Sequence, residues 1–182
     1  ARDTEFGLAH GFRGVRSVAE YQARVPVRDY GQLRPWLERA AAGEASVVWP
    51  GRCRDWVKTS GTTAGDKVIP VTPEAFASHK QGGWDALLRA ASLANGGQSL
   101  MGGPMLFLGG STALSPLGEG TQVGDLSGLV ASRLPWGLRG RYSPGVECAA
   151  IANWEERLDG IAAVVSRQDI RLLSGMPSWL VI

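Results

Sequence analysis

The chain has 182 residues, 44% of them hydrophobic and 20% charged, so it is long and apolar enough to bury a core rather than stay disordered. Its formal net charge is only +2, which gives no reason to expect a nucleic-acid partner. The two cysteines, Cys53 and Cys148, lie far apart without a second Cys or His at metal-binding spacing, which argues against a disulfide framework and a zinc site.

The N-terminal part of the chain predicts a helical lead-in. Ser17 and Glu20 have the spacing of a capping box. Asp29 and Gly43 mark the start and the stop of a longer helix. The predicted helices span residues 4–10, 17–24 and 29–42.

Short apolar runs follow the lead-in. They lie at residues 46–49, 55–58 and 67–71, and turn residues at Pro50-Gly51 interrupt them. The polar segment T-S-G-T-T-A-G therefore joins two expected strands. Behind it, Pro73 suits the first position of a helix, and apolar residues at helical spacing continue until the stop at Asn95-Gly96-Gly97.

The second half of the chain alternates expected strands and helices. Residues 105–108 predict a strand, and residues 109–124, rich in Gly, Ser, Thr and Pro, predict a loop. A helix is expected over 125–134 behind Asp125, another behind Asn153 to about residue 168, and a strand over 170–173. This alternation indicates an α/β fold without an internal boundary in residues 1–182.

Neither membrane nor export signals are visible. No run approaches the roughly 18 consecutive apolar residues that span a bilayer, and the first residues lack the pattern of a signal peptide. We therefore expect a cytoplasmic protein without a membrane partner. Because the chain starts without Met and stops inside the apolar run 179–182, we expect it to be truncated, with the rest of its own chain beyond Ile182. The alternative is that this run is the last buried strand of a complete domain.

The segment T-S-G-T-T-A-G-D-K, residues 59–67, has the composition of a phosphate-binding loop. Phosphates need oriented N–H donors and a backbone that approaches closely, which Gly61 and Gly65 permit. Lys67 offers a cation to the β- or γ-phosphate. The spacing differs from the standard P-loop, which has four residues between its glycines and Ser or Thr after its lysine. An ordinary hairpin turn is the alternative. The hydroxyl side chains of the segment are Thr59, Ser60, Thr62 and Thr63.

The wider sequence K-T-S-G-T-T-A-G-D-K resembles the Ser/Thr-Gly-rich signature of the adenylate-forming superfamily of acyl ligases and luciferase-like enzymes. V-P-V-R-D-Y-G-Q-L-R-P-W-L-E-R-A-A-A-G-E, residues 25–44, and I-P-V-T-P-E, residues 69–74, further resemble the auxin-responsive promoter family of acyl-acid amido synthetases. The resemblance is looser at 105–128 and in the final S-G-M-P-S-W. It implies that residues 1–182 form part of a large adenylate-forming N-terminal α/β domain with a helical lead-in.

This resemblance also implies an activity. Members activate a small carboxylic acid as its acyl-AMP, using ATP with Mg²⁺, and transfer the acyl group to an amino-acid or amine acceptor. The family's adenine- and ribose-binding motifs and its lid are absent from these residues, so the fragment alone should not turn over. Ala64 replaces the glycine common elsewhere in the superfamily, and Asp66 adds a charge that Mg²⁺ would offset. The motif positions are Ser60, Gly61, Thr62, Thr63, Gly65 and Lys67, with Lys67 as the catalytic cation and Thr59 beside them.

The implied mechanism is electrostatic and positional. The loop holds the β- and γ-phosphates while a carboxylate oxygen attacks the α-phosphorus in line. No general base is needed, because the nucleophile is already an anion. This agrees with a sequence whose only histidines, His10 and His79, lie outside any Ser or Cys nucleophile motif and are expected on the surface or in packing.

Other polar and aromatic residues have two interpretations each. The G-G-S-T at 109–112 is a second wall of the ligand site or a turn, and Asp125 is a ligand contact or an N-cap. The arginines around Trp136 stack on a nucleobase, grip an anion or belong to a solvated loop. Met176 and Trp179 are the candidates for contact with the carboxylic acid. These arginines are Arg133, Arg139 and Arg141, and the tryptophans expected in packing are Trp36, Trp84, Trp154 and also Trp179.

Two further classes of function remain open. A non-catalytic module that kept the nucleotide-binding loop is one, and a structural domain whose Gly-rich segment is only a turn is the other. We expect Gly61→Val to abolish nucleotide binding by steric exclusion and Lys67→Ala by loss of charge, with little effect on folding.

Overall fold

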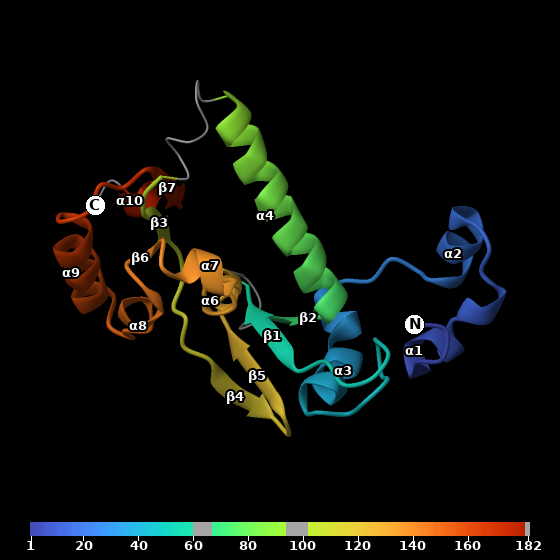
Figure 1. Ribbon diagram of the computed structural model, residues 1–182. Helices are drawn as coiled ribbons and strands as arrows, with labels where there is room; N and C mark the ends of the chain where they lie inside the picture. Colours follow the sequence, from blue (N-terminus) through green and yellow to red (C-terminus); the bar gives the residue numbers. More distant parts are fainter. Residues whose placement is uncertain (60–66, 94–101, 181–182) are drawn as a thin grey trace. The chain divides into compact units, whose positions relative to one another are not determined.

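A computed structural model describes residues 1–59, 67–93 and 102–180 (Figure 1). Its contacts divide the chain into two compact units, of which the first contains residues 1–73 and 115–123 and the second contains residues 74–114 and 124–182. Each unit has its own sheet and its own buried cluster. Helices and strands alternate along the chain, which confirms the predicted α/β class.

The helices of the first unit begin where their caps predict. Ser17 accepts a hydrogen bond from the Glu20 amide at 3.2 Å, but the Glu20 carboxylate accepts from the Arg16 amide instead of closing a capping box. The reciprocal box occurs at Asp29 and Gln32, whose side chains each accept from the other's backbone N–H. The helices are α1 (Glu5–Ala9), the 3₁₀ turn η1 (Phe12–Gly14), α2 (Val18–Arg24) and α3 (Tyr30–Ala41).

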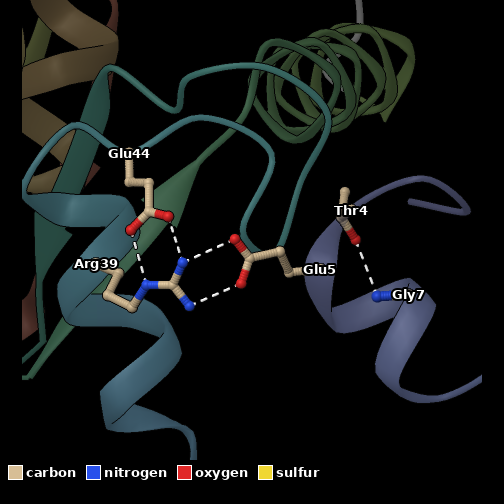
Figure 2. A network of polar contacts seen from close by, with 5 residues as sticks. All are labelled: Thr4, Glu5, Gly7, Arg39 and Glu44. Atoms are coloured by element: carbon tan, nitrogen blue, oxygen red, sulfur yellow. Dashed lines mark hydrogen bonds and ion pairs between the residues drawn. The ribbon is translucent and has the colours of Figure 1, made fainter.

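A network of ion pairs ties α1 to α3 (Figure 2). The Arg39 guanidinium donates to both oxygens of Glu5 at 2.8 Å and also contacts the Glu44 carboxylate. In the same helix α1, the Thr4 hydroxyl accepts from the Gly7 amide at 3.0 Å and caps the first turn. The network is partly exposed, so it orients α1 more than it stabilises the fold.

The sheet of the first unit has the strand order β2-β1-β5-β4. β1 (Asp55–Lys58) and β2 (Val68–Val71) pair antiparallel, with Asp55 opposite Val71 and Lys58 opposite Val68. Trp56 of β1 is fully buried against the end of α3, and its indole N–H donates to the Cys53 carbonyl at 3.0 Å. This packing fixes the hairpin on which the predicted phosphate loop lies.

The loop predicted over 109–124 is wrong in its second half. Residues there form a hairpin of β4 (Ser115–Gly118) and β5 (Thr121–Gly124). Thr121 and Val123 alternate inward and are buried, whereas β4 is exposed at the sheet edge, where Pro and Gly are tolerated. The apolar run 46–49 forms turns instead of a strand, and the amides of Glu5 and Phe6 donate to the Ser46 and Val47 carbonyls there.

The second unit is built around a parallel sheet of order β6-β3-β7. β3 (Met105–Leu108) lies in the centre, with β6 (Tyr142–Ser143) and β7 (Leu172–Gly175) on either side. β7 begins two residues later than predicted. Because parallel strands need crossovers, helices follow β3 and β6 before the chain returns.

The helices of the second unit cover this sheet and extend from it. α9 packs Ile161 against Leu106 and Leu108, and α6 and α8 pack around Tyr142. Asn153 caps α9 by accepting from the Glu156 amide at 3.1 Å, as predicted. The helices are α4 (Pro73–Leu93), α6 (Leu126–Ser132), α7 (Trp136–Arg139), α8 (Val146–Ala149), α9 (Trp154–Val165) and α10 (Pro177–Leu180).

Candidate functional site

The β1–β2 hairpin brings the two ends of the candidate phosphate loop together. The Thr59 amide donates to the Lys67 carbonyl at 3.0 Å, so Thr59 and Lys67 lie side by side at the end of the hairpin where the candidate loop connects β1 to β2. The residues between them lie outside the part of the chain that the structure describes, and their roles stay predictions. They are Ser60, Gly61, Thr62, Thr63, Ala64, Gly65 and Asp66.

Lys67 is held beside an aromatic ring. Its ammonium nitrogen lies 5.7 Å from the centroid of the Tyr30 ring, and Tyr30 is the first residue of α3. The Tyr30 hydroxyl accepts from the Val68 amide at 2.9 Å and donates to the Val68 carbonyl at 3.2 Å. The lead-in helix and strand β2 are thus joined at the residue next to Lys67.

Lys67 places a positive charge at this end of the hairpin. No carboxylate among the described residues forms an ion pair with Lys67, which is half-buried. A cation fixed in place without an anion suits the binding of phosphate oxygens. The described residues contain no cluster of three acidic, His or Cys side chains that would hold a metal ion.

The G-G-S-T segment after β3 serves as a structural turn. The Gly110 amide donates to the Ser127 hydroxyl at 2.7 Å, and the Thr112 hydroxyl donates to the Val146 carbonyl at 2.8 Å. These bonds fasten the end of β3 to α6 and α8. The segment's polar groups are therefore used within the fold, which favours the turn interpretation over a second ligand wall.

Asp125 occupies the N-cap position of α6 but does not cap it with its side chain. Its carboxylate accepts instead from the Ser111 amide at 2.9 Å. A Cβ at Gly110 would lie 2.4 Å from this carboxylate, so glycine is needed there. The sequence predicted a ligand contact or an N-cap for Asp125 and did not predict this bond. A single sequence does not show that the loop after β3 packs against the start of α6.

An apolar cavity of about 440 Å³ lies within the second unit. Its walls come from Trp84 and Leu87 of α4, Phe107 of β3, Tyr142 of β6 and Leu172 of β7. This volume falls in the range of about 300–1,000 Å³ that is typical of small-molecule sites. Burial raises the pKa of the Tyr142 phenol above its ordinary value, so this hydroxyl stays uncharged at neutral pH.

Two basic side chains on the cavity wall come from one turn of α4. His79 and Lys80 line the cavity together with Gly83, one helical turn before Trp84 and Leu87. The sequence predicted Trp84 in packing on a helix and His79 on the surface or in packing, and it did not single out Lys80. Residues 80, 84 and 87 have the spacing of one helix face. The same spacing is expected whether that face borders a cavity or a packed core.

Met176 and Trp179 do not line this cavity. Trp179 packs against the core of α9, with its ring centroid 5.0 Å from that of Trp154. Met176 is exposed between β7 and α10. Contact of either residue with the acid stays a prediction. Trp154 also lies under the buried Arg157 guanidinium, with 4.8 Å between guanidinium carbon and ring centroid.

The other candidate side chains show packing or surface roles. His10 stacks on Phe6 at 4.1 Å and lies 2.9 Å from the Arg28 guanidinium, which agrees with a packing histidine. Trp136 is 91% exposed, and the guanidinium of Arg133 lies over the Phe76 ring.

Neither cysteine has the environment of a reactive thiol. Desolvation raises the pKa of the Cys53 and Cys148 thiols, which disfavours the nucleophilic thiolate. Among the described helices, none is long and apolar enough to cross a membrane.

Relatives of known name match part of the chain. It is 33% identical over 78 residues to the probable indole-3-acetic acid-amido synthetase GH3.2 of Oryza sativa subsp. japonica, covering 42% of this chain and 13% of that protein. It is 35% identical over 75 residues to the putative indole-3-acetic acid-amido synthetase GH3.9 of Arabidopsis thaliana, covering 40% of this chain and 13% of that protein.

Solved structures show the same fold. GH3.15 acyl acid amido synthetase superposes with a TM-score of 0.65 at 18% sequence identity, over 85% of this chain and 26% of that one. The same synthetase in complex with 2,4-DB gives a TM-score of 0.59 at 23% identity, over 79% and 25%. The fold is therefore that of part of GH3.15 acyl acid amido synthetase.

The named relatives and solved structures are matched over only a part of their length, whereas the family profile covers most of this chain. The chain spans 13% of its named sequence relatives and about a quarter of the solved structures, so it corresponds to only a part of them. The profile of the GH3 family N-terminal domain matches residues 1–142, which is most of the chain. This confirms the resemblance predicted from the loop and its flanking segments, and the chain belongs to the GH3 family.

Proposed function

We propose that this chain is part of an enzyme that uses ATP to activate a small carboxylic acid as its acyl-adenylate and then transfers the acyl group to an amine, such as an amino acid. The observation that carries the proposal is the hairpin end, where Lys67 lies beside Thr59 without an anionic partner in the described part of the chain. Membership of the GH3 family and the relatives' names as amido synthetases support it.

Lys67 would act on the nucleotide phosphates as a fixed cation. ATP supplies an α-phosphorus that the carboxylate attacks, with pyrophosphate as the leaving group, and Mg²⁺ offsets phosphate charge. The ammonium group of Lys67 would stabilise the negative charge that grows on the leaving phosphates. Because the attacking carboxylate is already ionised, the reaction needs no histidine base. This is consistent with the packing of His10.

The acid's apolar body would occupy the cavity of the second unit. Aromatic and aliphatic walls at Trp84, Leu87 and Phe107 favour a hydrophobic acid, because burying apolar area stabilises it by about 25 cal/mol per Å². Lys80 and its neighbour His79 are the basic residues of the lining. We place the reaction in the cytoplasm, since both cysteines are free thiols.

The test is acid-dependent release of pyrophosphate by the full-length protein with Mg²⁺-ATP and a panel of aryl, indole and aliphatic carboxylic acids. We expect release that depends on the acid in the wild type and falls at least about tenfold in Lys67→Ala. Nucleotide binding without release for any acid would favour a non-catalytic module. Absence of nucleotide binding would contradict the proposal and leave a structural domain.

A further inference from the structure

Tyr30 contacts Lys67, the last residue of the candidate phosphate loop, and Val68, the residue that follows it. Its hydroxyl exchanges two hydrogen bonds with the backbone of Val68, and its ring lies under the Lys67 ammonium at 5.7 Å. These contacts link residues far apart in sequence, so they belong to the tertiary structure. One side chain therefore controls both the strand that follows the loop and the direction of Lys67.

The hydroxyl contacts follow from the strand register. Thr59 and Lys67 form a hydrogen-bonded pair, so the next pair, Lys58 and Val68, is one whose backbone groups point away from each other. β2 is an edge strand, and the N–H and C=O of Val68 would otherwise lack a protein partner on that side. The Tyr30 hydroxyl satisfies both, which fixes the start of β2 at the residue after Lys67.

The ring contact restricts where the lysine can point. A Lys side chain has many rotamers, and ordering them opposes the binding of a phosphate. A cation within about 6 Å of an aromatic centroid is attracted to the ring face, which favours a subset of these rotamers. The attraction is weaker than that of a phosphate, so nucleotide can still capture the ammonium.

We propose that Tyr30 is a positioning residue that presents Lys67 to the nucleotide phosphates. This inference rests on the proposed function, since it takes Lys67 as the cation that meets ATP. The aromatic ring restricts the lysine, and the hydroxyl holds β2. Tyr30 itself touches neither the nucleotide nor the reacting atoms.

The first test separates ring from hydroxyl in the full-length protein. Tyr30→Phe keeps the ring and removes the two bonds to Val68, whereas Tyr30→Leu removes both features. Tyr21→Leu is the matched control, because Tyr21 packs on Phe12 at 5.8 Å and has no contact with Lys67. We expect Tyr30→Leu to weaken Mg²⁺-ATP binding by about two- to fivefold, with Tyr30→Phe and Tyr21→Leu within about twofold of wild type.

A double-mutant cycle with Lys67→Ala tests whether the ring acts through the lysine. Tyr30→Leu should have no further effect on the Mg²⁺-ATP dissociation constant once Lys67 is gone. An equal loss in both backgrounds, or a Tyr30→Phe loss as large as that of Tyr30→Leu, would overturn the proposal and leave Tyr30 a structural residue.

A second measurement keeps the proposal testable if the proposed function fails. Protons on the Lys67 side chain that lie over an aromatic face experience ring-current shielding in NMR spectra of the nucleotide-free protein. We expect this shielding in wild type and Tyr30→Phe and its loss in Tyr30→Leu. Shielding unchanged in Tyr30→Leu would contradict the contact itself, whereas shielding without any ATP binding would leave the contact intact and refute only the nucleotide role.

Discussion

The sheet that carries the candidate phosphate loop and the sheet beside the cavity are built in different ways. In the first unit, β1 and β2 form an antiparallel hairpin of strands that are close in the sequence. A hydrogen bond from Thr59 to Lys67 joins the two strands where the candidate loop begins and ends. In the second unit, β3 pairs in parallel with β6 and β7, which lie far along the chain. The loop's position is thus set locally, whereas the cavity exists only when distant segments have come together.

This difference separates two kinds of candidate site residue. Lys67 stands out in the sequence because it closes the Ser/Thr-Gly-rich segment 59–67, which resembles the superfamily signature. The cavity residues Trp84, Phe107 and Tyr142 are ordinary apolar residues whose role depends on tertiary structure. A substitution at Lys67 should therefore change ATP binding, whereas a substitution in the cavity should change binding of the acid.

The largest effect is expected from filling the cavity. A Cβ at Gly83 meets no atom within 4 Å, so Gly83→Leu should fold and project into the cavity. Because one or more added methylenes change binding by about 10- to 200-fold in such a site, we expect KM for the acid to rise by about tenfold or more. KM for ATP should stay the same.

The neighbouring glycine supplies the control for this change. Gly82 also has open space at its Cβ position, but it does not line the cavity. Gly82→Leu adds the same helix-forming side chain to α4 and should leave KM for the acid unchanged. Equal effects of the two substitutions would show that the cavity is not the acid site.

An intermediate effect is expected at Asp125, whose carboxylate accepts a hydrogen bond from the Ser111 amide of the loop after β3. Asp125→Ala leaves the Ser111 amide without its partner and should lower the free energy of unfolding by about 1–3 kcal/mol. Asp125→Ser keeps a good capping residue, but its side chain is too short to replace the bond, so it should not rescue stability. Urea unfolding checks this, and full rescue by Ser would mean that capping matters instead.

The smallest effect concerns the ion pairs of the first unit. Hydrogen bonds from Arg39 hold the pKa of Glu5 below its ordinary value of 4.5. The carboxylate therefore contributes stability that is present above pH 4.5 and is lost as the pH falls through the lower, folded-state pKa. The melting temperatures of wild type and Arg39→Met should converge as the pH falls below that value. A gap that persists at low pH would indicate packing by the arginine stem.

Much of the first unit could be predicted from sequence because its signals are local. Ser17 and Asp29 cap helices at the expected residues, and the β1–β2 hairpin lies where the apolar runs place it. In the second unit, Asn153 caps α9 as expected. The β4–β5 hairpin was missed because Gly and Pro dominate it and only Thr121 and Val123 alternate into the core.

The rest depends on contacts that a single sequence does not encode locally. The bond from the Ser111 amide to Asp125 and the contact of Tyr30 with Lys67 join segments far apart in the chain. The cavity depends on α4 packing near β3, and the helical spacing of Trp84 and Leu87 is the same for a core as for a binding site.

The most direct test of the account is calorimetric titration of Mg²⁺-ATP into the full-length protein, comparing wild type with Lys67→Ala and Lys80→Ala. Lys80 lines the cavity and serves as a lysine control outside the candidate loop. We predict that Lys67→Ala weakens binding by about ten- to a hundredfold, as expected for a lost charge-assisted contact, while Lys80→Ala has no effect. Unchanged ATP affinity in Lys67→Ala would contradict the central claim that this hairpin presents a phosphate-binding cation.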